Sequence, residues 1–265
     1  MPGDVDFHEH LEQESARFGA AIQDVPPQAP VPACPDWDAD DLLWHLAEVQ
    51  FFWAAVVREN LARAEAEKLT PPRPGDRAGL LACYRRASRG LGEILAATSP
   101  DTPAWTWSDD HTVGFILRRQ AHEALIHRVD AELTAGGRTA IDARLAADGV
   151  DEGLRVMYGA CPGWGTITPA PGRTVRIRAT DTGHSWLVTL GRFTGTDPDE
   201  GKTYDEPDIH VARTDSGGPA RAEISGAAAD LDCWLWHRPP AGPVHRSGDA
   251  GVLGGFDEVI RPGIN

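Results

Sequence analysis

The spacing of apolar residues divides the chain into a helical first half and a strand-rich second half. In the first half, apolar residues recur at intervals of three and four, the spacing of helices that bury one face. We predict helices over residues 7–23, 38–69, 76–95 and 113–135. Four helices of such lengths, joined by short loops, indicate an antiparallel four-helix bundle.

Polar residues that favour helix N-termini precede three of these segments, namely Asp36 or Asp38, Asp76 and Thr112. A Pro-rich passage over residues 26–35 separates the first two helices and is expected to be a rigid connector. Further prolines or glycines follow the other helices, so the ends of the segments are marked in the sequence as well as their starts.

The pattern changes after about residue 140. A helix over 142–158 is expected to lead out of the bundle, and short alternating segments bounded by Gly, Asp or Pro then predict strands. The predicted strands are 174–178, 185–190, 208–212 and 222–225, followed by a helix over 227–236 and a last short element over 248–260. This order predicts a small α+β domain. We place the domains at 1–158 and 159–265.

Composition excludes several classes of function. The 265-residue chain has a formal net charge of -15 and no basic stripe in its sequence, which argues against binding to nucleic acid or to an anionic membrane. No apolar run approaches the length of a membrane span, and the acidic N-terminus lacks the features of a signal peptide. The four cysteines are far apart and form no Cys-x-x-Cys pair. We therefore expect a cytoplasmic protein without a disulfide framework.

The candidate chemistry lies on two of the predicted helices. Glu123 and His127 are four residues apart, so both side chains leave the same face of the fourth helix. His45 lies on the second helix and offers a third ligand. A carboxylate and two imidazoles can hold one divalent metal ion, and three protein ligands leave a coordination position open, as in catalytic zinc sites. Bundles build such sites in their interior, from facing helices.

Each of these residues also has an ordinary interpretation. Glu123 and His127 match a solvated salt bridge or hydrogen bond, and His45 matches a hydrogen-bonded core histidine. His122 and His127 are about 140° apart around a helix, so the pattern is not that of a zincin and His122 is expected to point elsewhere. Asp130 either orients a metal ligand or forms a surface salt bridge.

Several segments resemble one family. They are Ala33–Trp37 with Asp41–Leu46, Arg119–Leu133, and Gly226–Leu231 with Leu235–Arg238. With these segments the chain resembles the actinobacterial mycothiol-dependent maleylpyruvate isomerase family over nearly its whole length. Its first half is similar to the DinB/YfiT-like metal-binding bundle of that family, and its second half is similar to the family's sterol-carrier-like α+β domain.

The resemblance implies a divalent metal, usually zinc, held by His45, Glu123 and His127. It also implies mycothiol as the thiol cosubstrate and a small electrophilic molecule as the substrate. The reference member of the family isomerises maleylpyruvate by thiol addition, rotation and elimination, and other members transfer the thiol. An arginine of the C-terminal domain supports catalysis in that member, and Arg238 is the candidate match. Where the family often has a small residue before this arginine, the chain has His237.

Other points stay open at this level. A substrate with two carboxylates needs cationic partners, for which Arg238 or Arg128 is available, although a surface salt bridge is the simpler role for Arg128. A zinc-dependent hydrolase of a small amide or thiol conjugate, and a non-catalytic small-molecule-binding protein, are the alternative functions. The donor set does not separate zinc from nickel, iron or copper. No surface is recognisable from sequence as a subunit interface.

Overall fold

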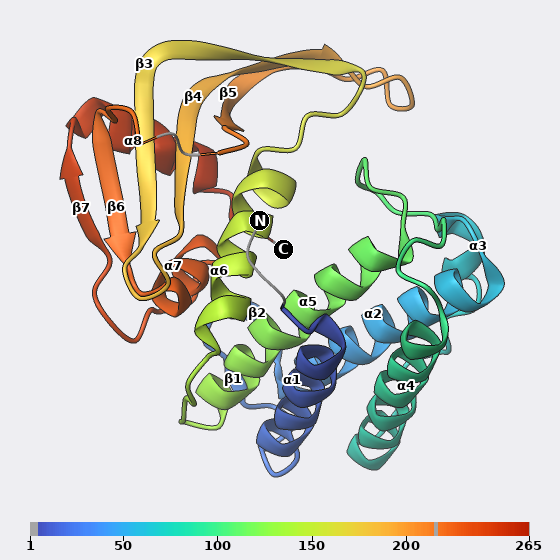
Figure 1. Cartoon of the computed structure of the whole chain (residues 1–265). Helices are drawn as coiled ribbons and strands as arrows, with labels where there is room; N and C mark the ends of the chain where they lie inside the picture. Colours follow the sequence, from blue (N-terminus) through green and yellow to red (C-terminus); the bar gives the residue numbers. More distant parts are fainter. Residues whose placement is uncertain (1–4, 215–216, 265) are drawn as a thin grey trace. The chain divides into compact units, whose positions relative to one another are not determined.

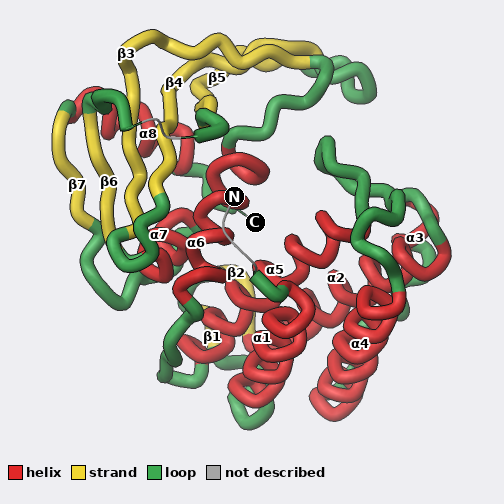
Figure 2. Tube along the Cα trace, in the orientation of Figure 1, coloured by secondary structure: helices red, strands yellow, loops and turns green. Residues whose placement is uncertain are grey.

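The computed structural model of the chain describes residues 5–214 and 217–264. The chain forms two compact units, a helical unit over 6–140 and a second unit that begins at Ile141. Figures 1 and 2 show helices in the first unit and a mixture of strands and helices in the second. Each unit has its own apolar core.

The helical unit follows the predicted pattern closely. Its helices are α1 (Phe7–Ile22), α2 (Ala39–Glu59), α3 (Arg63–Glu67), α4 (Arg77–Ala97) and α5 (Val113–Thr134). The side chains of Asp38, Asp76 and Thr112 accept hydrogen bonds from backbone N–H groups in the first turns of α2, α4 and α5, as expected of N-caps. Helix α1 packs against α5 and α4, and α2 packs against α4 and α5.

Two features of this unit differ from the sequence-based prediction. Helix α2 ends at Glu59 instead of Leu69, because Asn60 adopts a left-handed conformation with φ 50° that stops the helix. The Pro-rich passage is not only a connector: β1 (Pro30–Val31) and β2 (Cys34–Asp38) pair antiparallel within it. Strand β2 leads directly into α2 and therefore sets where α2 begins.

The second unit begins with α6 (Ala143–Glu152), which continues as the π-helical turn η1 (Gly153–Tyr158). The strands are β3 (Gly165–Ala179), β4 (Ser185–Thr196), β5 (Thr203–Val211), β6 (Ala222–Gly226) and β7 (His245–Gly248). Among the described residues they form one sheet in the order β5-β4-β3-β6-β7. β3 and β6 are parallel, and the other neighbouring pairs are antiparallel.

The helices of this unit complete its core. Helices α7 (Ala228–Leu235) and α8 (Ala250–Ile260) contribute apolar side chains that pack with those of α6 and the sheet. The four predicted strands are all present, but β3 and β4 are much longer than expected. No residue in the first part of β3, residues 165–174, is buried. This part therefore lacks the alternation of buried and exposed residues that marks a half-buried strand. All residues of β7 are exposed, and the pattern missed this strand for the same reason.

The division into units lies one helix earlier than the boundary we placed between 158 and 159. Helix α6 contacts α7, and its apolar residues belong to the core of the sheet-containing unit. The four cysteines form no disulfide bond, and all four lie among the described residues. Over residues 5–214 and 217–264, no helix has the length and apolar character required to cross a membrane.

Candidate metal centre

Three side chains from two helices meet in the helical unit. His45 comes from the second turn of α2, and Glu123 and His127 come from one face of α5. One ligand atom from each of the three lies within 4.8 Å of the other two. The predicted convergence of these residues is therefore present in the fold.

The carboxylate of Glu123 is the centre of the cluster. Its Oε1 lies 3.2 Å from Nε2 of His45 and 3.2 Å from Nε2 of His127. The two imidazole rings stand edge to face, with 4.8 Å between their centroids. Two ring nitrogens and one carboxylate oxygen thus point toward one another, an arrangement suited to gripping one cation.

Further hydrogen bonds, outside the three-residue cluster, hold the side chains of His127 and Glu123 in place. Nδ1 of His127 lies 3.0 Å from Oδ2 of Asp130, whose side chain is fully buried. A carboxylate on Nδ1 holds the proton there and leaves Nε2 directed at the cluster, as is usual behind metal-bound histidines. Asp130 therefore forms a buried pair with His127 and not a surface salt bridge.

Glu123 has a second partner as well. Nη2 of Arg119 donates a hydrogen bond of 2.9 Å to Oε2, the carboxylate oxygen that faces away from the histidines. Arg119 lies one turn before Glu123 on α5 and is only 4 % exposed. Arg119 has no role in the sequence-based prediction, although its spacing of four residues from Glu123 is a usable signal.

The environment shifts the pKa values of two members of the cluster. Burial opposes ionisation of Glu123, but hydrogen bonds from both histidines and the charge of Arg119 outweigh it and hold the pKa of Glu123 well below its usual range. Burial likewise opposes the imidazolium of His127, but the carboxylates of Asp130 and Glu123 raise the pKa of His127 to about 9. At neutral pH the cluster therefore favours the ionised carboxylate of Glu123 and the protonated imidazole of His127.

Trp37 packs against both imidazoles. Its ring lies 4.7 Å from that of His45 and 6.1 Å from that of His127, centroid to centroid. Trp37 lies at the end of β2, one residue before the N-cap of α2, so the β1–β2 pair holds it against the cluster. The side chain of His45 is 31 % exposed and that of His127 only 9 %, so the cluster is more accessible from the α2 side.

Two neighbouring residues on α5 lie elsewhere. His122 points away from the cluster, as expected, but it is buried against Phe7 and not on the surface. Arg128 is fully buried, so the expected surface salt bridge is wrong. Its Nε donates to Glu14 and its Nη1 to Glu132, which ties α5 to α1 and removes Arg128 as a partner for substrate carboxylates.

Arg238, the predicted catalytic arginine, belongs to the sheet-containing unit. It follows α7, is 7 % exposed, and donates a hydrogen bond of 2.7 Å from Nη1 to the carbonyl of Trp236. The preceding His237 has φ 58°, a conformation that favours glycine. The backbone therefore supplies a reason for a small residue before this arginine. A contact between Arg238 and a substrate stays a prediction.

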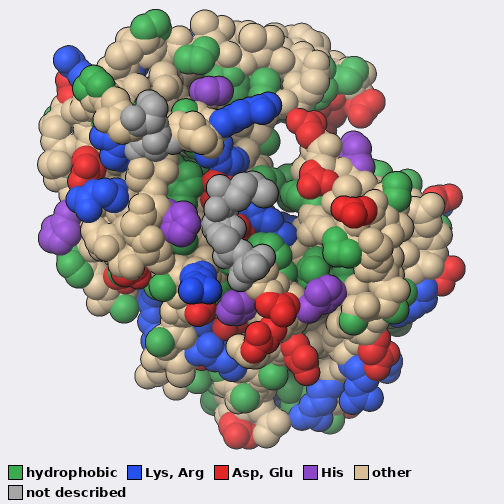
Figure 3. Space-filling view, in the orientation of Figure 1, with side chains coloured by type: hydrophobic (Ala, Val, Ile, Leu, Met, Phe, Trp, Pro, Cys, Tyr) green, Lys and Arg blue, Asp and Glu red, His purple; other side chains and the backbone are tan. Residues whose placement is uncertain are grey.

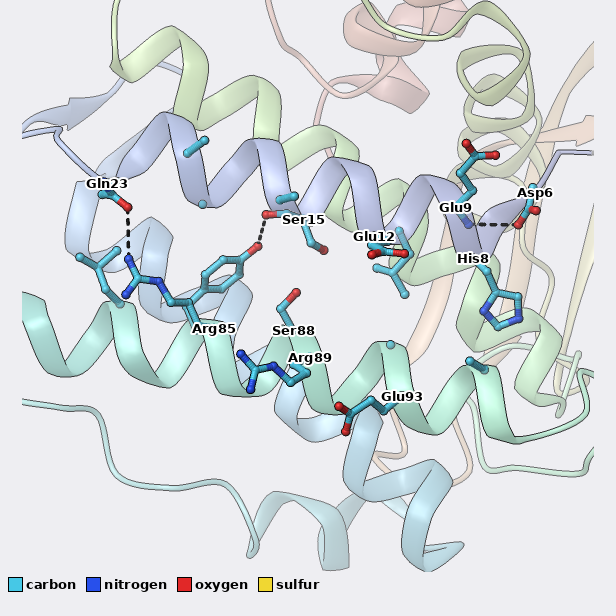
Figure 4. Close-up of a pocket in the computed structure, with 18 residues that line it drawn as sticks. Asp6, His8, Glu9, Glu12, Ser15, Gln23, Arg85, Ser88, Arg89 and Glu93 are labelled. Atoms are coloured by element: carbon cyan, nitrogen blue, oxygen red, sulfur yellow. Dashed lines mark hydrogen bonds between the residues drawn. The ribbon is translucent and has the colours of Figure 1, made fainter.

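A separate groove of about 950 Å³ runs between α1 and α4 (Figure 4). Glu9 and Glu12 lie toward one end and Arg85 toward the other. A second hollow on α4 is lined partly by Arg85, Arg86 and Arg89, and Figure 3 shows basic side chains gathered over this helix. The residues of the metal-ligand cluster do not line either hollow.

A helical unit with a His–Glu–His cluster, followed by a unit built on a mixed sheet, defines a two-domain α+β protein with a candidate metal centre. Residues 8–132 match the profile of the mycothiol maleylpyruvate isomerase N-terminal domain. Residues 144–255 match the profile described as the MDMPI C-terminal domain. The chain therefore belongs to the mycothiol-dependent maleylpyruvate isomerase family.

Solved structures agree with this assignment at the level of the fold. The chain is similar to crystal structures of the mycothiol-dependent maleylpyruvate isomerase and of a histidine-to-alanine mutant of that enzyme, with TM-scores of 0.56 and 0.58. In both comparisons the identity is 14%, and the alignment covers 94% of this chain and 97% of that chain. No curated protein sequence matches the chain.

Proposed function

We propose that the protein is a metal-dependent enzyme that uses mycothiol to attack a small electrophilic molecule, as an isomerase or a thiol transferase. The observation that carries this proposal is the convergence of His45, Glu123 and His127 within 4.8 Å. Membership of the family and the similar fold of a mycothiol-dependent maleylpyruvate isomerase support the choice of thiol and reaction class.

The donor set fits a divalent metal of borderline softness, zinc above all. His45 and His127 would each bind through Nε2, and Glu123 through Oε1. Asp130 keeps Nδ1 of His127 protonated, so that Nε2 is available as a ligand. A bound zinc ion would supply a Lewis acid that favours the thiolate form of a coordinated thiol.

The chain's own residues would position the metal and the substrate, and they would exclude water from one side of the site. The four-helix bundle that we propose as scaffold presents the ligands from two helices, so their spacing is set by helix packing. Trp37 covers one side of the imidazoles with an apolar ring, which limits water there. Arg238 is our candidate for holding a substrate carboxylate, with support from the family resemblance. Dependence on a reduced thiol favours the cytoplasm as the location.

One alternative is favoured by a specific observation. Two histidines and one glutamate are also the zinc ligands of some hydrolases, in which the metal activates water. Turnover of an amide or thiol conjugate without added thiol would support this function. Strict dependence on thiol would exclude it.

The first test is metal analysis of the purified protein. We expect about one equivalent of zinc in the wild type and loss of that zinc in His45→Ala and Glu123→Ala. His111→Ala is the matched control, because His111 is an exposed histidine of the same unit outside the cluster. Metal-loaded protein is then assayed with mycothiol and electrophiles, maleylpyruvate first. Wild-type protein without metal, or full activity in His45→Ala, would contradict the proposal.

A further inference from the structure

The two carboxylate oxygens of Glu123 have different surroundings. Oε1 lies 3.2 Å from the Nε2 atoms of both histidines, whereas Oε2 accepts a hydrogen bond of 2.9 Å from Nη2 of Arg119. One oxygen therefore faces the proposed metal position and the other is engaged by a guanidinium. This asymmetry bears on how the carboxylate can bind a metal.

Arg119 is built into the helix rather than free to move to another position. It is 4 % exposed and lies on the same face of α5 as Glu123, one turn earlier. A guanidinium has donors and no acceptor, so it cannot itself bind a metal. Its hydrogen bond to a carboxylate is charge-assisted and therefore strong. This hydrogen bond joins two residues of one helix, so it does not serve to link α5 to another helix.

We propose that Arg119 is a positioning residue that restricts Glu123 to one-oxygen metal coordination and so keeps a coordination position open for the thiol. This inference rests on the proposed function, because it requires the metal. A free carboxylate binds cations through one oxygen or through both. If Oε2 also bound, it would occupy the space that an incoming sulfur needs.

Arg119→Met should preserve or raise the affinity for zinc and lower the affinity for thiol. In Arg119→Met, Oε2 is released and a positive charge near the metal is lost, so zinc should bind at least as tightly as in the wild type. Thiol should bind more weakly, by roughly tenfold or more, the lower end of the loss of activity, about 10–100-fold, that is typical of changes next to a metal ligand. If Arg119 only supported the fold, its replacement would weaken the binding of both zinc and thiol.

Cobalt(II) substitution provides the measurement. Four-coordinate cobalt absorbs visible light more strongly than five-coordinate cobalt, so we expect weaker absorption in Arg119→Met than in the wild type. Titration with 2-mercaptoethanol, followed by the sulfur-to-cobalt charge-transfer band, gives thiol affinity, and competition with a chelator gives zinc affinity. Arg119→Lys retains the charge and a donor and should stay close to the wild type. Arg63→Met, on the exposed surface of the same unit, controls for loss of one charge.

A crystal structure of the zinc-loaded wild type tests the coordination mode of Glu123 without a variant, in case Arg119→Met does not fold. One carboxylate oxygen at about 2.0–2.2 Å from zinc is expected. Two such oxygens from Glu123, or an unchanged cobalt spectrum and thiol affinity in Arg119→Met, would overturn the inference while leaving the metal site standing. Weaker zinc binding with an unchanged cobalt spectrum would also overturn it. Wild type that binds no metal would overturn the proposed function itself.

Discussion

At the scale of single residues, each of the two candidate metal ligands on α5 is held by a second side chain. Asp130 holds His127, and Arg119 holds Glu123. The sequence predicted that His45, Glu123 and His127 would converge, and spacings of three and four residues on one helix also offered Asp130 as a neighbour of His127. It misplaced Arg128, because the pattern of one helix does not reveal that its neighbours cover it on nearly every side.

Asp130 gives a direct prediction about metal affinity. Asp130→Asn keeps the shape of the side chain but removes the charge that supports Nδ1–H of His127. We expect zinc binding to weaken by about 10–100-fold, measured by competition with a chelator. Asp109→Asn, an exposed residue of the same unit, is the control. Equal zinc affinities in Asp130→Asn and the wild type would show that this hydrogen bond does not support the ligand.

Asp208 in the sheet-containing unit gives a prediction about pH. Burial, with Glu206 nearby, raises the pKa of Asp208 to about 6 from its ordinary 3.8. The folded protein therefore binds this proton more tightly than the unfolded chain does. The resulting stability is present below pH 3.8 and is lost as the pH rises through 6.

At pH 8 the free energy of unfolding of Asp208→Asn should consequently exceed that of the wild type by roughly 1–3 kcal/mol, after allowance for solvent screening. The two proteins should differ little near pH 4. Denaturant titrations at both pH values measure this, with Asp199→Asn, which is exposed, as the control. A constant difference between the proteins across the pH range would contradict the assignment.

At the scale of elements, α5 is the helix on which the first unit depends. It is buried on most of its surface and packs against both α1 and α2. Buried ion pairs join Arg128 of α5 to Glu14 of α1 and to Glu132 one turn along. The spacing of apolar residues predicted the helices well, but it missed the end of α2, which Asn60 marks in place of the commoner Gly or Pro.

Arg128→Met tests the α1–α5 connection. Removal of the guanidinium takes away the buried cation that Glu14 and Glu132 share, although Arg17 still contacts Glu14 and Thr139 still donates to Glu132. We therefore expect a loss of about 3 kcal/mol in the free energy of unfolding, the lower end for a broken buried pair. Denaturant unfolding measures the loss. The double variant Glu14→Gln with Arg128→Met should recover part of it, because one buried negative charge is removed. A loss below about 1 kcal/mol would mean that water reaches these groups.

At the scale of the whole molecule, two units with separate cores follow one another along the chain. Composition and pattern predicted this two-part α+β organisation. They did not predict the parallel pairing of β3 with β6, because strands so far apart in sequence leave no local signal of their pairing. The domain boundary was also displaced, since α6 has a helical pattern that fits either unit.

Metal removal should distinguish the two units. A ligand that binds only the folded state stabilises it by mass action, by about 2.7 kcal/mol at a hundredfold excess over Kd. We expect zinc to raise, and a chelator to lower, the unfolding temperature of the helical unit in calorimetry. Glu123→Ala should show no such shift. A zinc-dependent shift that persists in Glu123→Ala would place the metal outside the cluster.

The candidate metal ligands and the side chains that hydrogen-bond to them all lie between Trp37 and Asp130, in one unit. Such a site can be inherited with the helical unit alone. A lineage that exchanges, reshapes or loses the sheet-containing unit would keep the proposed metal site, because its three candidate ligands all lie in the helical unit. Selection could then alter which substrate the enzyme accepts without altering the proposed metal site.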